Sequence, residues 1–128
     1  MEQPSPKTIL LVDDNEQVRF LMARVLSENG YRVVQANDGA AALRVLARTE
    51  PEIQLLITDV VMPDMTGFQL ASHIIAACNV PVLFVSAFEL TGGDIPGPVL
   101  QKPFTPTVLV DAVRRLLALT GPSVKQPA

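Results

Sequence analysis

The sequence predicts an α/β domain in which a parallel β-sheet carries helices on both faces. Its 128 residues, 48% of them hydrophobic, suit one globular domain with a sizeable core. Short apolar runs of strand length alternate with longer segments whose apolar residues recur at helical spacing. This alternation is typical of parallel strands joined by right-handed crossover helices. Because ligands of such sheets bind outside the carboxyl ends of the strands, the residues that follow each strand are the first candidates for a site.

The first half of the chain supplies two strands, each followed by a helix. Residues 9–12 are apolar and lead through three polar residues into a helix that should stop at Gly30. The residues expected on the inner face of that helix are Val18, Leu21, Met22, Val25 and Leu26. Residues 31–36 are expected to form the second strand, and Asp38 is placed to cap the next helix. Its expected inner face comprises Ala42, Leu43, Leu46 and Ala47.

The third strand includes residues 55–57, whose uninterrupted apolar character is typical of a strand buried on both faces. The strand ends at Asp59, and a loop with the sequence MPDMTG and a helix over residues 68–78 follow. The apolar stripe of this helix comprises Leu70, Ala71, Ile74 and Ile75. Cys78 continues the stripe and is expected in the core, whereas His73 lies opposite it and is expected at the surface.

The rest of the chain supplies two more strands and a last helix. Residues 82–85 should form a strand ending at Ser86, and residues 99–101 a short strand before Lys102. Thr105 is placed to cap the last helix, with a proline at its first position. The residues expected on the inner face of this helix are Val108, Leu109, Ala112, Val113, Leu116 and Leu117.

Composition and chain ends narrow the classes of protein. A formal net charge of −3 does not favour a nucleic-acid partner, and the longest apolar runs are too short to span a membrane. The first residues lack the basic flank and apolar core of a signal peptide, so we expect a cytoplasmic protein. The domain should occupy residues 8–120, between a flexible leader over 1–7 and a flexible tail over 121–128. The single cysteine cannot form an internal disulfide, and no Cys/His cluster has zinc spacing.

Polar side chains follow four of the five expected strands. They are Asp13, Asp14, Asp59, Ser86 and Lys102. Each of these residues alone is more often a helix cap, a turn residue or an ordinary surface residue. Because the carboxyl ends of parallel strands meet at one edge of a sheet, however, all five should lie close together. Their joint occurrence therefore predicts a site at that edge.

The residue types in this set suit phosphoryl transfer. Three neighbouring carboxylates repel one another unless a cation is supplied, and oxygen ligands in that number suit Mg²⁺. With the metal bound, one carboxylate can attack an activated phosphoryl group and form an aspartyl phosphate. Lys102 would supply a positive charge to the phosphoryl oxygens, and Ser86 a hydroxyl donor. The five residues together predict a magnesium-dependent site that accepts a phosphoryl group.

Four motifs in this order resemble the receiver domain of two-component response regulators, the CheY-like family. They are LLVDD at residues 10–14, TDVVMPDMTG at 58–67, VSA at 85–87 and QKPF at 101–104. The likeness extends from about residue 8 to residue 119. It implies a flavodoxin-like, doubly wound sheet of five parallel strands in the order 2-1-3-4-5. Its short connection between Ser86 and Lys102 most resembles the receivers attached to hybrid histidine kinases.

The resemblance also implies a role for each residue of the site. Asp59 would accept the phosphoryl group from a phosphohistidine on a histidine kinase or a histidine phosphotransfer protein, while Ser86 and Lys102 would hold the phosphoryl oxygens. The ligands of Mg²⁺, the only expected cofactor, would be Asp13 acting largely through a water, Asp14, Asp59 and the main-chain carbonyl of Val61. The peptide bond between Lys102 and Pro103 would be cis. Catalysis would be limited to self-phosphorylation and slow autodephosphorylation, so we expect no separate enzyme activity.

The sequence departs from the family pattern in two places. Val99 stands where the family usually has Tyr or Phe, so the aromatic switch of the family should be absent. Only 15 residues separate Ser86 from Lys102, and their glycines and prolines break helices. The family normally fits a helix there, so the fourth helix should be missing or vestigial. Two interpretations of residues 87–98 stay open: a segment that reorders on phosphorylation, or a static connecting loop.

Other functions stay open beside the phosphorelay receiver. A magnesium-dependent phosphatase also forms an aspartyl phosphate, but such enzymes favour a second Asp where this chain has Val61. A flavodoxin-like cofactor binder would need a Gly-rich or Thr/Ser-rich phosphate loop after the first strand instead of two aspartates. A protein-interaction module that is not phosphorylated would more often have lost part of the set of five residues.

Partner surfaces are the last expectation. Nothing follows Ala128, so no separate output domain is expected, and a homodimer is left open because many receivers self-associate. In the family, the first helix and the loop after the lysine face the kinase. Phe20, Phe104 and Pro106 would therefore form a docking patch, with Phe20 off the inner face of its helix.

Overall fold

The structure is a computed structural model of the chain, and it describes residues 6–48, 52–90 and 95–119. These residues form nine elements: β1 (Thr8–Val12), α1 (Glu16–Glu28), β2 (Arg32–Ala36), α2 (Gly39–Leu46), β3 (Leu55–Asp59), α3 (Gly67–Cys78), β4 (Val82–Ser86), β5 (Val99–Gln101) and α4 (Pro106–Leu119). The expected leader and tail lie almost wholly outside the described residues, as does the side chain of Cys78. Within the described part of the chain, no helix is long and apolar enough to cross a membrane.

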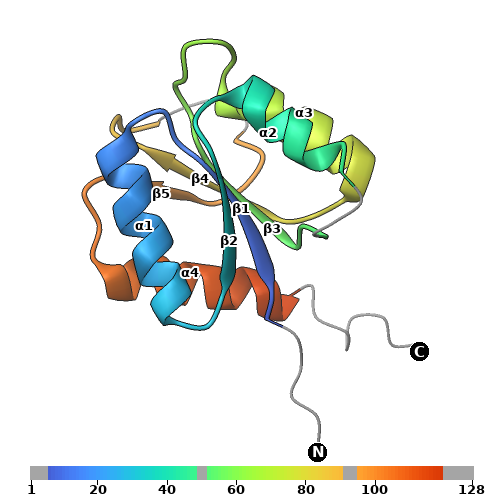
Figure 1. The fold of residues 1–128 in the computed structure, drawn as a ribbon. Helices are drawn as coiled ribbons and strands as arrows, with labels where there is room; N and C mark the ends of the chain where they lie inside the picture. Colours follow the sequence, from blue (N-terminus) through green and yellow to red (C-terminus); the bar gives the residue numbers. More distant parts are fainter. Residues whose placement is uncertain (1–5, 49–51, 91–94, 120–128) are drawn as a thin grey trace, which may run out of the picture.

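The sheet has five parallel strands in the order β2-β1-β3-β4-β5 (Figure 1). The strand order implied by the family resemblance is therefore confirmed. β1 lies at the centre of the reversal in strand order, with β2 on one side and β3 on the other. Its register pairs Val12 with Thr58, which brings the residues after β1 next to the end of β3. This pairing decides which side chains meet at the edge of the sheet.

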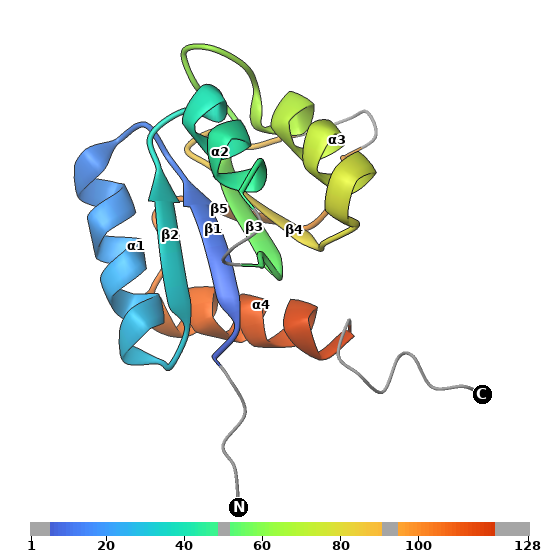
Figure 2. The same ribbon diagram turned by 45° about the vertical axis from the view of Figure 1, so that its right-hand side comes forward.

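Helices cover both faces of the sheet. Figures 1 and 2 show α2 and α3 on one face and α1 and α4 on the other. The two apolar clusters follow this division: one joins Leu10 and Leu56 with α2 and α3, and the other joins Ile9 and Leu55 with α1 and α4. Every residue of β1, β3 and β4 is buried, as their continuous apolar runs predict for strands covered on both faces.

Side-chain caps fix where the helices begin. Asn15 accepts a hydrogen bond from the Val18 N–H at the start of α1, and Asp38 accepts one from the Ala41 N–H at the start of α2. Thr66 forms a capping box with Gln69 at the start of α3. The Thr105 hydroxyl accepts from the Val108 N–H at 3.2 Å, which confirms the expected cap of α4. Gly30 follows α1 with a φ of 93°, a conformation that favours glycine.

Four inner-face predictions are wrong. Leu21 on α1 is 63% exposed, Ile75 on α3 is 39% exposed and Val108 on α4 is 43% exposed, although all three were expected to face the core. Ala47 is exposed because α2 ends at Leu46, and Val45 is buried instead. Neighbouring positions on a helix differ by about 100°, so the rotation of the helix decides which flank of the apolar stripe meets the sheet. That rotation is set by tertiary packing and selects Ala23 and Val110 over Leu21 and Val108.

The chain passes from β4 to β5 without a helix among its described residues, 87–90 and 95–98. In the described part of the chain four helices accompany the five strands, and the expected loss of the usual fourth helix is confirmed. Gly97 lies close to β4, where an added Cβ would approach the Val82 carbonyl oxygen to 3.0 Å. Val99 is half-buried and packs against the cluster that contains Phe84. The last residues of the connection, Gly97 and Pro98, thus lie against β4.

Candidate functional site

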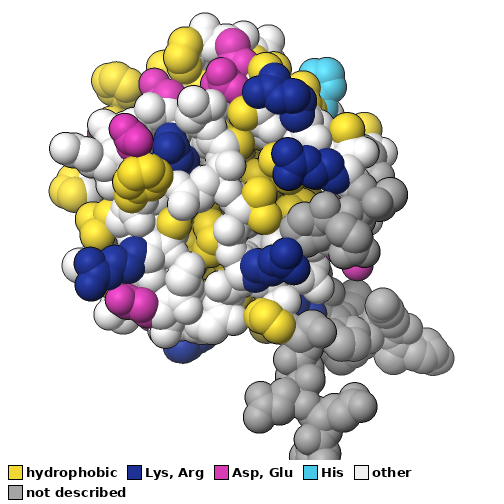
Figure 3. Space-filling model, in the orientation of Figure 1, with side chains coloured by type: hydrophobic (Ala, Val, Ile, Leu, Met, Phe, Trp, Pro, Cys, Tyr) yellow, Lys and Arg dark blue, Asp and Glu magenta, His cyan; other side chains and the backbone are white. Residues whose placement is uncertain are grey.

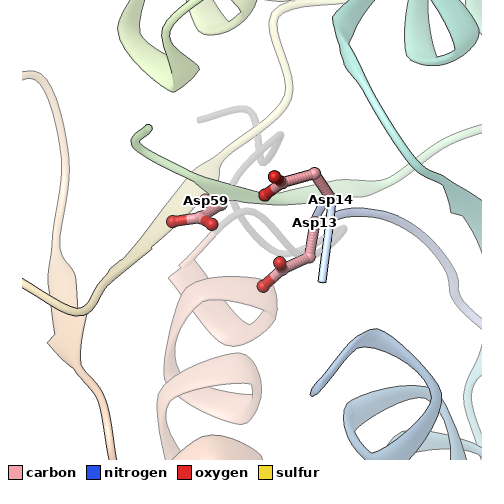
Figure 4. A group of neighbouring side chains, drawn as sticks. All are labelled: Asp13, Asp14 and Asp59. Carbon is pink, nitrogen blue, oxygen red and sulfur yellow. The ribbon is translucent and has the colours of Figure 1, made fainter. Parts of the chain in front are cut away.

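Three carboxylates meet at the carboxyl edge of the sheet. Asp13 and Asp14 directly follow β1, and Asp59 is the last residue of β3. Each can offer one oxygen so that the three oxygens lie within 4.8 Å of one another. Figure 4 shows the three side chains projecting into one region from the ends of these neighbouring strands. The sequence prediction that they gather at this edge is confirmed.

The three carboxylates differ in their exposure to solvent. Asp13 is fully buried, Asp59 is 9% exposed and Asp14 is exposed. Burial, together with the negative charge of Asp13, raises the pKa of Asp59, while Lys102 acts in the opposite direction. The site is therefore an acidic pocket, buried on the Asp13 side and open to solvent on the Asp14 side.

Lys102 contacts two of the three carboxylates. Its Nζ lies 2.9 Å from Asp13 Oδ2 and 3.5 Å from Asp59 Oδ2. The Lys102 N–H donates to the Ser86 carbonyl at 2.7 Å, which ties the residue after β5 to the end of β4. The Lys102–Pro103 peptide bond is cis, as the family resemblance implied. The lysine follows the edge strand β5, and its side chain thus bridges the ends of β1 and β3.

Asp13 is held on both of its carboxylate oxygens. Oδ2 accepts from Lys102, and Oδ1 accepts from the Asn15 N–H at 2.9 Å. Arg19 fixes the same stretch of main chain, because its Nη1 donates to the Asp13 carbonyl at 2.9 Å and its Nε to Gln35 at 3.0 Å. Arg19 was not predicted from the sequence, because an arginine on a helix carries no local signal of a contact with Gln35, sixteen residues away in β2.

Ser86 lies beside the pocket with its hydroxyl engaged in a local turn. Its side chain is buried, and Oγ donates to the Phe88 carbonyl at 2.9 Å and accepts from the Phe88 N–H at 3.0 Å. The hydroxyl therefore anchors the first residues of the connection to β5. The structure places Ser86 at the expected strand end and shows a turn contact that the sequence did not predict in detail.

Val61 begins the loop that follows Asp59. Its side chain is exposed, whereas its neighbours Val60 and Met62 are buried. The Gly67 N–H donates to the Val60 carbonyl at 2.8 Å and closes the loop at its base. Gly67 also allows close packing there, since an added Cβ would collide with the Asp59 carbonyl. Val61 therefore lies two residues after Asp59, in a loop whose base is closed at Val60 and Gly67.

The donor set of the pocket fits a hard divalent cation. Three carboxylates supply only oxygen ligands, which suits Mg²⁺, and the exposed side at Asp14 leaves room for its water ligands. Like charges so close together are also stabilised when a cation lies between them. Asp13, Asp14 and Asp59 are the side chains that could hold the ion.

An apolar groove runs from the lysine along α1. One hollow of about 190 Å³ is lined by Val18, Leu21, Met22, Lys102, Pro103 and Phe104. A second adjoins it and shares Leu21, Met22 and Phe104 with it. Pro106 lines this second hollow, whereas the exposed Phe20 lies outside both, next to Arg19. Figure 3 shows hydrophobic side chains on the surface over α1. The expected patch is thus present for Phe104 and Pro106, with Leu21 beside them.

Comparison with known proteins identifies a family whose domain accords with this fold. A family model described as "Response regulator receiver domain" matches residues 9–92. The chain is 36% identical over 121 residues to "Response regulator MprA" of Mycobacterium leprae (strain TN), covering 89% of this chain and 52% of that protein. The chain spans about half the length of the curated relatives it matches.

Solved structures of receiver domains are similar to this fold. The receiver domain from the hybrid histidine kinase CckA is 34% identical, with a TM-score of 0.76 over 86% of this chain and 98% of that one. A response regulator receiver protein from Sinorhizobium medicae WSM419 is 27% identical, with a TM-score of 0.81 over 91% of this chain and 98% of that one. The first of these matches accords with the likeness to receivers of hybrid kinases seen in the sequence.

Proposed function

The chain belongs to the response regulator receiver domain family, and from this premise we propose that it accepts a phosphoryl group on Asp59 in a magnesium-dependent reaction. The single observation that carries the proposal is the convergence of three carboxylates and one lysine at the carboxyl edge of the sheet. The donor would be a phosphohistidine on a histidine kinase or a histidine phosphotransfer protein.

Asp59 is the proposed nucleophile. A carboxylate oxygen of Asp59 would attack phosphorus while the bond from phosphorus to the donor nitrogen breaks and its electron pair stays on the imidazole. Asp59 suits this role because it combines partial burial with access from the exposed Asp14 side. Asp13 is already held by Lys102 and the Asn15 N–H, which favours Asp59 as the carboxylate that reacts.

The proposed ligands of Mg²⁺ are Asp13, Asp14, Asp59 and the main-chain carbonyl of Val61. When bound, the ion supplies positive charge that offsets the repulsion among the carboxylates and among the oxygens of the incoming phosphoryl group. The residues of the chain do the rest. Asn15 and Arg19 hold the end of β1, and the hydrogen bond from Gly67 to Val60 holds the loop after β3.

Lys102 and Ser86 are the proposed contacts to the phosphoryl oxygens. Lys102 now binds two carboxylates and would shift its Nζ toward the added dianionic group. Ser86 would turn its hydroxyl from the Phe88 carbonyl to a phosphoryl oxygen and so release the start of the connection to β5. The segment 87–98 would then reorder, which is the first of the two interpretations of this loop.

The groove beside α1 is the proposed docking surface for the phosphodonor protein. It lies next to Lys102, and its lining at Leu21, Phe104 and Pro106 is apolar. A helical bundle that presents a histidine would cover this groove and bring the donor over Asp59. We also propose that the domain needs no further catalytic residue, since alignment and charge stabilisation are what phosphoryl transfer mainly requires.

Intact-mass measurement after incubation with acetyl phosphate tests the proposal. Wild type should gain the mass of one phosphoryl group when Mg²⁺ is present and none when EDTA replaces it. The Asp59→Asn variant should gain none under either condition. A wild-type protein that stays unmodified with abundant Mg²⁺ and donor would refute the proposed function.

A further inference from the structure

Asp64, at the tip of the loop between β3 and α3, binds the first turn of a different helix. Its Oδ1 accepts a hydrogen bond from the Gly39 N–H at 3.1 Å, and its Oδ2 accepts one from the Ala40 N–H at 2.9 Å. Both donors belong to the start of α2. The carboxylate therefore joins two segments that are about 25 residues apart in the sequence.

The next residue strengthens this contact. Gly39 is buried, and an added Cβ there would collide with the side chain of Met65. Met65 itself packs against the apolar cluster under α2 and α3. The loop is thus fastened to α2 by a polar contact at Asp64 and an apolar contact at Met65.

The helix does not need Asp64 merely to have a cap. Asp38 already caps α2, because its side chain accepts from the Ala41 N–H at 2.8 Å. Asp64 takes up the two N–H groups before it, which face the loop. These two hydrogen bonds hold the pKa of the Asp64 carboxyl below its usual value, as expected for a carboxylate at a helix N-terminus. The pair Asp38 and Asp64 therefore separates two functions: one caps the helix, and the other fastens the loop.

The fastened loop is the one that leaves the acidic pocket. It begins directly after Asp59, and Gly67 closes its base by donating to the Val60 carbonyl. Val61 lies between this closed base and the tip at Asp64. The loop is thus fixed at two points that flank the main chain of Val61.

We propose that Asp64 is a positioning residue for the divalent-cation site: by binding the first turn of α2, it fixes the loop that carries the Val61 carbonyl. The inference rests on the proposed function, in which Val61 and Asp59 are ligands of Mg²⁺. Asp64 itself touches neither the ion nor the phosphoryl group. Its removal would leave the three carboxylates in place and loosen the fourth ligand.

Titration with Mg²⁺ followed by backbone amide spectra tests this inference, because it measures binding without any phosphoryl transfer. Asp64→Ala should weaken Mg²⁺ affinity about tenfold, the lower end for residues that orient metal ligands. Asp64→Asn keeps one acceptor oxygen and should weaken affinity by about threefold. If Asp64→Ala gives no folded spectrum, the threefold loss in Asp64→Asn decides the matter.

Asp38→Ala is the matched control. It removes a hydrogen bond to the same helix turn and should lower the melting temperature, yet leave Mg²⁺ affinity at the wild-type value. Wild-type affinity in the Asp64 variants would overturn the inference, as would an equal loss in Asp38→Ala. A failure of the proposed function is distinguishable, because wild type itself would then bind no Mg²⁺ or accept no phosphoryl group.

Discussion

Lys102 Nζ and Asp13 Oδ2 are 2.9 Å apart, and the aspartate of this pair is fully buried. The pair spans the sheet, since Asp13 follows β1 and Lys102 follows β5. It leaves Asp59 as the less firmly held carboxylate, 3.5 Å from the same nitrogen. The Lys102 ammonium therefore offsets the negative charge of both carboxylates.

Lys102→Met tests this balance. Loss of the ammonium leaves the buried Asp13 carboxylate without its partner, so the metal-free protein should lose about 2 kcal/mol of unfolding free energy. The value lies below that for fully buried pairs because the lysine side chain is 18% exposed. Thermal unfolding in EDTA measures the loss as a fall in Tm of about 6 °C or more. Mg²⁺ should restore most of it, and an unchanged Tm in EDTA would contradict the prediction.

Asp59→Asn should stabilise the metal-free protein at neutral pH. Burial and the nearby Asp13 raise the pKa of Asp59 above its ordinary value of 3.8, so the folded state binds a proton more readily than the unfolded state. Wild-type stability from this group is then full below the ordinary pKa and falls as pH rises through the raised one. Asn has no ionisable carboxyl group, so the variant does not lose this stability as pH rises.

Chemical denaturation from pH 3 to pH 7 checks the sign, with the gain of Asp59→Asn appearing as pH rises through the raised pKa of Asp59. At pH 3 the two proteins should be nearly equal. A variant that is less stable than wild type at pH 7 in EDTA would show that Lys102, and not burial with Asp13, dominates the environment of Asp59.

Ser86→Ala separates the metal site from the phosphoryl site. The hydroxyl contacts only the Phe88 main chain among the contacts described, so Mg²⁺ affinity should not change. Phosphorylation by acetyl phosphate should slow by about tenfold or more, because one donor to the phosphoryl oxygens is lost.

Amide spectra with beryllofluoride should shift at Ala87 to Leu90 in wild type. A silent segment there would support a static connecting loop.

Leu21→Ala probes the groove beside α1. Leu21 is exposed and lines both hollows, so its truncation should slow phosphoryl transfer from a phosphorylated donor protein several-fold, by about 1 kcal/mol of binding. The rate with acetyl phosphate should stay the same, since that donor needs no docking. Phe20→Ala is the comparison, because Phe20 is exposed outside the groove. Equal rates for Leu21→Ala and wild type with the protein donor would refute the groove as the docking surface.

Local patterns predicted the strands and the polar residues at their ends, because a buried parallel strand is readable as an apolar run and its end as the polar residue that follows. Asp13, Asp59, Ser86 and Lys102 were placed at strand ends in this way, and the order of the strands came from the family resemblance. Side-chain contacts between distant segments that do not both end at this edge of the sheet could not be predicted. Nothing local to Asp64 or Arg19 indicates that one binds α2 and the other the Asp13 carbonyl.

The same limit explains the errors at the helix flanks. The apolar stripe of α1 admits Leu21 or Ala23 as its edge, and only packing against β2 and α4 selects Ala23. The exposure of Leu21 is then useful, since it supplies the wall of the groove. A residue whose pattern predicts core but whose side chain faces solvent is a reasonable place to look for a partner surface.

Asp59 is the residue proposed to carry the phosphoryl group. Borohydride reduces an aspartyl phosphate to homoserine. Peptide mass spectrometry of the protein, treated with acetyl phosphate and Mg²⁺ and then with borohydride, therefore identifies the phosphorylated side chain directly. Homoserine should appear at position 59 alone, and at no position when Mg²⁺ is withheld. Homoserine at position 13 or 14, or at no aspartate while Mg²⁺ and donor are abundant, would refute the assignment of Asp59.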